Sequence, residues 1–119
     1  MKDKRKIGFN SEDKVALFLM RRGFTLVAKN YSVHNVGELD LVMRKGDCLY
    51  VVEVKSRLES DWQSPSEAID SGKRKRILKT TQIFIQSKGY FDKDVIFLAG
   101  CVTHNLEGIV QKIEIIPFE

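Results

Sequence analysis

The most constraining feature of the sequence is an almost wholly apolar run from Val95 to Val102. An apolar run of this length without alternating polar residues is typical of a strand that is buried on both faces. Such a strand needs packed layers above and below it. We therefore expect it to be central in a sheet that is covered by helices, which defines the α/β sandwich class.

Periodicity elsewhere predicts the order helix, three strands, helix, two strands. The first helix should begin at Asn10 or Ser11 and stop at Gly23, because asparagine and serine cap helices and glycine ends them. The second should open at the capping box Ser64-Pro65-Ser66-Glu67, with a break near residues 71–72, and should stop at Gly89. The strands are expected over residues 24–29, 37–43, 49–55, 95–102 and 109–116.

Length and composition fit one soluble domain. The chain has 119 residues, of which 43% are hydrophobic and 30% are charged, and this is enough for a single packed core. We expect one domain over residues 1–119, with a flexible basic tail over residues 1–8. The sequence has neither the apolar length of a membrane span nor the apolar run of a signal peptide, so we expect a cytoplasmic protein without a membrane partner.

Positive charge is concentrated in the run Lys73-Arg74-Lys75-Arg76, which is followed by Lys79. The net charge of +4 permits a polyanionic partner without requiring one. A basic run on a helix is typical of a solvated face and also of a nucleic-acid contact. Charge alone leaves both interpretations open.

Two acids and a lysine are expected to converge at one end of the hairpin formed by residues 37–43 and 49–55. Asp40 and Glu53 lie on adjacent strands, and Lys55 follows Glu53 by two residues on the same face. Two carboxylates and the backbone carbonyl of Val54 are hard oxygen ligands that suit Mg²⁺. A nearby ammonium group can orient a metal-bound water or stabilise charge on a phosphate. The set therefore predicts a metal-dependent phosphodiesterase site.

A simpler interpretation is an exposed hairpin on which Glu53 and Lys55 form a salt bridge. The continuous apolar run Leu49–Val52 argues against it, because this run buries both faces of the strand just before Glu53. A carboxylate at the end of a buried strand is costly unless it is bound or paired.

Glu12 falls on the inward face or the rim of the first helix, three, four and seven residues before Val15, Ala16 and Leu19. A glutamate in the first turn also complements the helix dipole. From the helix alone, the dipole role is the preferred explanation.

The segments Gly37-Glu38-Leu39-Asp40 and Val52-Glu53-Val54-Lys55-Ser56-Arg57, with Glu12 upstream and Lys73 downstream, resemble the bacterial YraN/UPF0102 family of uncharacterised proteins. The resemblance spans nearly the whole chain. That family is placed in the PD-(D/E)XK nuclease superfamily, although Leu39 stands here where the superfamily's name has proline. The resemblance implies a restriction-endonuclease-like α-β-β-β-α-β-β fold, similar to archaeal Holliday junction resolvases, and an endonuclease activity.

The resemblance also implies roles for individual residues. Asp40 and Glu53 would be metal ligands, Lys55 the catalytic lysine, and Glu12 the helix-borne acid that completes the site, in place of a dipole role. Glu38 is a weaker candidate. The residues expected to contact nucleic acid are Arg57, Lys73, Arg74 and Arg76, and Arg57 has pairing with Glu38 as its alternative.

These observations predict a Mg²⁺- or Mn²⁺-dependent endonuclease that acts on duplex or branched DNA. A resolvase-like role would require a homodimer that presents two sites. The main alternative is a non-catalytic nucleic-acid-binding or assembly module with the same fold, since fold does not fix function. A structural or chaperone-like interaction protein is a third and weaker interpretation.

Overall fold

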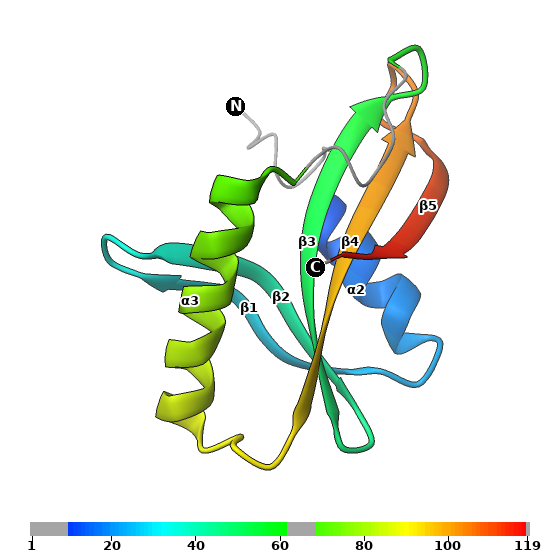
Figure 1. The fold of residues 1–119 in the computed structure, drawn as a ribbon. Helices are drawn as coiled ribbons and strands as arrows, with labels where there is room; N and C mark the ends of the chain where they lie inside the picture. The colour runs from blue at the N-terminus through cyan, green and yellow to red at the C-terminus, as the bar shows by residue number, and fades with distance from the viewer. Residues whose placement is uncertain (1–9, 62–68, 119) are drawn as a thin grey trace, which may run out of the picture.

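The computed structural model describes residues 10–61 and 69–118. The elements follow the predicted α-β-β-β-α-β-β order (Figure 1). They are α2 (Ser11–Met20), β1 (Thr25–Val33), β2 (Gly37–Lys45), β3 (Cys48–Leu58), α3 (Ser71–Lys88), β4 (Asp94–His104) and β5 (Val110–Pro117). The protein is therefore an α/β protein that has, within these residues, one mixed sheet and two helices, consistent with a restriction-endonuclease-like sandwich. The expected basic tail and the capping box at residues 64–67 lie outside the described residues.

The five strands lie in the order β1-β2-β3-β4-β5. Neighbouring strands are antiparallel except for β3 and β4, which pair in parallel and are connected through α3. The prediction of a doubly buried strand is confirmed for residues 98–102 of β4. The middle of the sheet is β3, however, and β4 lies between it and the edge strand β5.

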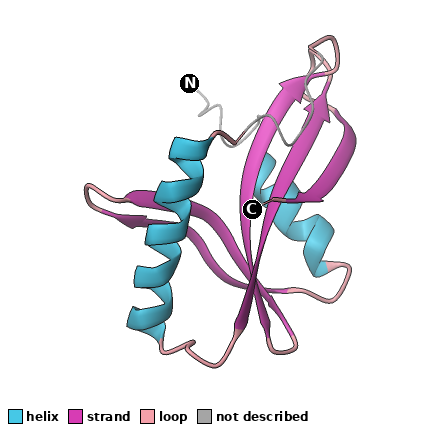
Figure 2. Ribbon diagram, in the orientation of Figure 1, coloured by secondary structure: helices cyan, strands magenta, loops and turns pink. Residues whose placement is uncertain are grey.

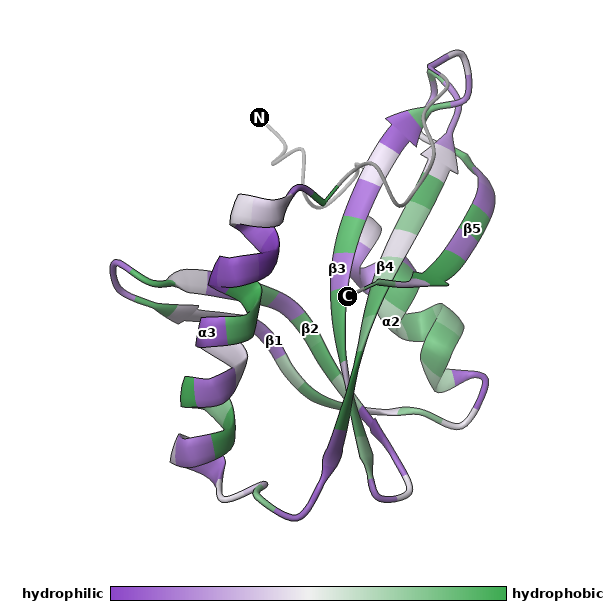
Figure 3. Cartoon of the chain, in the orientation of Figure 1, coloured by the Kyte–Doolittle hydropathy of each residue, from purple (hydrophilic) through white to green (hydrophobic). Residues whose placement is uncertain are grey.

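The two helices cover opposite faces of the sheet, and each has its own apolar cluster (Figure 2). Val15, Ala16 and Leu19 of α2 pack with buried residues of β2, β3 and β4. Ile77 and Phe84 of α3 pack against the other face. Figure 3 shows hydrophilic residues over much of α3 and hydrophobic residues along the inner strands. Over the described part of the chain, no helix has the length and hydrophobicity to cross a membrane.

Helix capping explains where the helices begin. The side chain of Asn10 accepts a hydrogen bond from Asp13 N, which satisfies a free donor in the first turn of α2. The side chain of Asp70 does the same for Lys73 N, so α3 begins at Ser71, close to the predicted break. Gly89 ends α3 in the left-handed conformation, with φ of 74°, as predicted.

Strand β1 extends beyond the predicted end at Lys29 and continues to Val33. It passes through Asn30, which has a positive φ of 53°. Strict alternation along the predicted strand of residues 37–43 puts Leu39 on the same face as Leu41 and Met43, and the structure differs from this expectation. Leu39 packs in the cluster beneath α3, whereas Leu41 and Met43 pack in the cluster beneath α2. Strands β1 and β2 therefore change faces together near Asn30 and Asp40.

Candidate functional site

The site lies where β2 and β3 separate. Their pairing runs from Lys45 opposite Cys48 to Leu41 opposite Val52, and it ends there. Beyond this point, side chains take over the backbone donors: Asp40 N donates to Glu53 Oε2 at 3.4 Å, and Val54 N donates to Asp40 Oδ2 at 2.8 Å. The two carboxylates are thus held side by side at the open end of the hairpin.

The two carboxyl groups are poorly hydrated. Glu53 is only 1% exposed, and burial, with a further contribution from the charge of Asp40, raises its pKa to about 8. Burial also raises the pKa of Asp40, although the N–H of Val54 and the charges of Lys73 and Lys55 act in the opposite direction. Ionising both carboxylates here is costly, and a bound cation would offset that cost.

Two lysines approach the pair from different elements. Lys73 lies in the first turn of α3, and its Nζ is 4.0 Å from Glu53 Oε1. Lys55 is half-buried on β3, on the same face as Glu53 by strand alternation. The structure thus brings Asp40 and Glu53 together, and Lys55 lies close enough for its charge to lower the pKa of Asp40.

Glu12 joins the site from α2. It is half-buried, and burial followed by the charge of Asp40 raises its pKa. Asn30 lies close enough for its side-chain amide to act in the opposite direction and lower that pKa. The structure thus places Glu12 near Asp40 as well as in the first turn of α2.

Asn30 is the residue of the site that sequence reasoning missed. The predicted strand ends at Lys29 and leaves Asn30 in a loop, whereas Asn30 lies inside β1. Its residue type was the available signal, because asparagine adopts positive φ more readily than most residues other than glycine.

Glu38 lies at the rim of the site. Its side chain is exposed and accepts a hydrogen bond from Ser32 Oγ at 3.1 Å. Its charge helps to raise the pKa values of Asp40 and Glu53. Glu38 therefore acts on the site through its charge.

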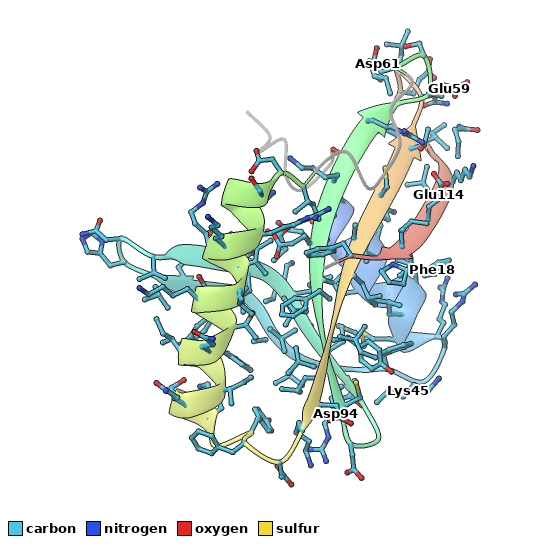
Figure 4. All side chains as sticks on the ribbon, in the orientation of Figure 1. Phe18, Lys45, Glu59, Asp61, Asp94 and Glu114 are labelled. Carbon is cyan, nitrogen blue, oxygen red and sulfur yellow. The ribbon has the colours of Figure 1, made fainter. Side chains whose placement is uncertain are left out.

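Arg57 does not pair with Glu38. Its guanidinium donates to Thr103 Oγ1 and to Glu114 Oε1, each at 3.2 Å, and Glu114 belongs to β5 (Figure 4). The alternation of β3 still places Arg57 on the face that carries Glu53 and Lys55. Arg57 therefore lies on the same face of β3 as the site, and its hydrogen bond with Glu114 connects it to β5.

The basic residues of α3 lie in different environments. Arg74 lies over the ring of Phe118, 6.0 Å from its centroid, in a small apolar hollow on the side of α3 away from β1 and β2. Arg76 is exposed and lines a hollow of about 300 Å³ beside the β1–β2 turn, together with Lys75 and Lys79. Of the four predicted nucleic-acid contacts, Lys73 lies nearest to the carboxylates.

The donor set fits a hard divalent cation. Within residues 10–61 and 69–118, no three acidic, histidine or cysteine side chains form a ready-made ligand group. Mg²⁺ commonly needs only one or two carboxylates and keeps several waters, so Asp40 and Glu53 suffice. In an extended strand, the N–H and C=O of one residue point to the same side, so the Val54 carbonyl points towards Asp40 as its N–H does.

Fold and site together define an α/β-sandwich protein with a buried carboxylate pair at the open end of a central hairpin. Comparison with known proteins identifies the family more closely. The model of the uncharacterised protein family UPF0102 matches residues 11–98, a range that contains Glu12, Asp40, Glu53, Lys55 and Lys73. The chain belongs to this family.

Relatives support this assignment over most of the chain. A UPF0102 protein of Dictyoglomus turgidum is 35% identical over 113 residues, which cover 95% of both chains. One of Dictyoglomus thermophilum is 40% identical over 84 residues, covering 71% of this chain and 70% of the relative. One of Pseudomonas paraeruginosa is 36% identical over 89 residues, covering 75% and 70%.

Proposed function

We propose that this protein is a metal-dependent endonuclease that hydrolyses phosphodiester bonds in DNA. The observation that carries the proposal is the buried pair Asp40 and Glu53, whose carboxylates are held together where β2 and β3 separate. Burying two carboxylates side by side is costly when both are ionised. A bound divalent cation would compensate for this cost.

In this proposal Asp40, Glu53 and the carbonyl of Val54 hold Mg²⁺ or Mn²⁺. The bound metal would stabilise negative charge on the phosphate and lower the pKa of a coordinated water. The hydrogen bond from Val54 N fixes the Asp40 carboxylate, so its second oxygen stays free for a ligand. Burial of Glu53 excludes bulk water from the same position.

Lys55 and Glu12 act on the substrate side of the pair. Lys55 stands two residues beyond Glu53 on the same face, where its ammonium can stabilise charge on the scissile phosphate. Glu12 approaches from α2 and its charge acts on Asp40, so its carboxylate can orient the attacking water through a hydrogen bond.

The cations of α3 extend the site along the DNA backbone. Lys73 lies beside Glu53, and the exposed Arg76 lies one helical turn further along. Phosphate contacts of this kind position DNA without reading its sequence. The proposed substrate class is therefore duplex or branched DNA bound by its backbone, with affinity that falls as salt rises.

The test is cleavage of labelled single-stranded, duplex, flap and four-way-junction DNA with Mg²⁺ or Mn²⁺. Asp40→Asn should lower the rate by about a hundredfold or more, because the amide can still accept from Val54 N but is a poor metal ligand. The matched control is Asp47→Asn, at the exposed turn of the same hairpin, which should cleave like the wild type.

Equal cleavage by Asp40→Asn and wild type would show that the site is wrongly assigned. If neither protein cuts any substrate but both bind DNA in a salt-sensitive and metal-independent way, the non-catalytic binding module replaces the nuclease.

A further inference from the structure

Asn30 has an unusual backbone for its place in the fold. Asn30 and Asn35 are the non-glycine residues with positive φ in the described part of the chain. Asn35 lies between β1 and β2, where a turn requires such a conformation. Asn30 lies inside β1, between the paired positions Lys29 opposite Leu41 and Tyr31 opposite Leu39. This register puts Asn30 opposite Asp40.

The left-handed residue makes β1 change faces. In a regular strand, residues two apart share a face. Here Lys29 forms a salt bridge with Asp13 of α2, whereas Tyr31 packs edge-on against Phe84 of α3, with ring centroids 5.0 Å apart. The partner strand changes faces at the same level, around Asp40. The kink at Asn30 therefore lies at the level where β2 separates from β3 beside the carboxylate pair.

The side chain of Asn30 reaches the other acid of the site. Its amide lies close enough to the Glu12 carboxylate to act on the pKa of that group, while the preceding Lys29 forms a salt bridge with Asp13. Strand β1 thus lies against both acids of the first turn of α2. The charge of Asp40 also acts on Glu12, so Asn30 and Asp40 both lie near this carboxylate.

We propose that Asn30 is a positioning residue that sets the distance and orientation of Glu12 relative to Asp40. Its left-handed backbone forms the kink opposite Asp40, and its amide holds the Glu12 carboxylate. The effect on metal binding and cleavage rests on the function proposed above, whereas the Asn30–Glu12 contact itself does not.

Two substitutions separate the backbone role from the amide role. Asn30→Gly keeps access to positive φ and removes the amide. Asn30→Asp keeps a residue that tolerates positive φ and places a carboxylate against Glu12. Both variants should stay folded, and both should lose about tenfold or more in Mn²⁺ affinity and in cleavage rate, as is typical when a residue that orients a group beside the metal is removed. Asn35→Gly is the matched control and should change neither quantity.

A double-mutant cycle with Glu12→Ala tests the mechanism. If Asn30 acts through Glu12, Asn30→Gly should cause no further loss of Mn²⁺ affinity in the Glu12→Ala background. Independent, additive losses would overturn the proposal.

The same cycle, measured as shifts in the urea unfolding midpoint, needs neither metal nor substrate. Non-additive shifts are expected, and additive shifts would show that Asn30 does not hold Glu12. If the wild type neither binds Mn²⁺ nor cuts DNA, the proposed function fails, and the unfolding cycle still decides whether the contact exists.

Discussion

The two ends of the β2–β3 hairpin differ in how they satisfy the backbone. At the closed end, from Lys45 and Cys48 to Leu41 and Val52, the strands pair with each other. At the open end, the carboxylates of Glu53 and Asp40 accept from backbone N–H groups instead. Burial at the closed end stabilises the folded protein, whereas holding two acids together at the open end destabilises it.

This difference shows how a sheet can hold a chemically active site at its centre. Buried backbone groups need partners, so a ladder can open only where other acceptors take its place. Asp40 and Glu53 serve as those acceptors, and each has a second carboxylate oxygen that these two hydrogen bonds do not use. Substitutions at the two ends should therefore have opposite effects on stability.

The largest effect on stability is expected at the closed end. Met43 is fully buried in the cluster beneath α2, so Met43→Ala should lower the free energy of unfolding by about 2 to 5 kcal/mol. Urea denaturation measures this loss. Cleavage by the folded fraction should remain near the wild-type rate, and a loss as large as that of Asp40→Asn would contradict the functional separation of the two ends.

At the open end, Glu53→Gln should stabilise the metal-free protein at alkaline pH. The carboxyl group ionises near pH 4.5 in the unfolded chain and near pH 8 in the folded protein. Unfolding therefore releases a proton between these values, and the stability of the wild type falls as pH rises through this window. The penalty reaches a few kcal/mol at the upper end.

Urea midpoints at pH 5 and pH 8, with a chelator present, test this prediction. The wild type should lose more stability than Glu53→Gln between the two pH values. An identical loss in both proteins would mean that Glu53 is not the group responsible.

A smaller effect is expected where β2 begins. A methyl group at Gly37 would lie 2.7 Å from Thr80 Oγ1 and 3.4 Å from the Arg76 carbonyl oxygen of α3. Gly37→Ala should therefore push α3 away from the open end and cost about 1 to 3 kcal/mol. A fall in the thermal unfolding midpoint of Gly37→Ala would confirm this prediction. Gly46→Ala is a comparison variant at the closed end: its methyl group would meet no other atom, although the φ of 61° at this position disfavours alanine.

The smallest effect is expected at the salt bridge between Lys29 and Asp13, whose side chains are partly exposed. Lys29→Met should cost no more than about 1 kcal/mol, because such pairs gain little in water. The difference from wild type should shrink in 1 M salt, which screens the charges. If the loss of stability in Lys29→Met is the same in 1 M salt, it comes from lost packing and not from the salt bridge.

The sequence predicted the element order and the convergence of the acids because periodicity reports which residues are buried. It failed at Leu39 because alternation assumes a regular strand, and the left-handed Asn30 breaks that regularity. The polar residues Asn30 and Ser32 also made the second half of β1 resemble a loop. The sequence around Arg57 did not predict its salt bridge with Glu114, because Glu114 lies in β5, far from Arg57 in the sequence.

The parallel pairing of β3 and β4 also has a consequence for folding kinetics. This pairing joins Cys48 to Asp94 across the whole of α3, whereas the β2–β3 hairpin closes over a short turn. Contacts that are distant in sequence form slowly, because the loop entropy must be lost before they contribute. We expect β3–β4 docking to limit the folding rate. The segment that carries both Asp40 and Glu53 is thus the one that the chain can assemble first, before Lys73 arrives with α3.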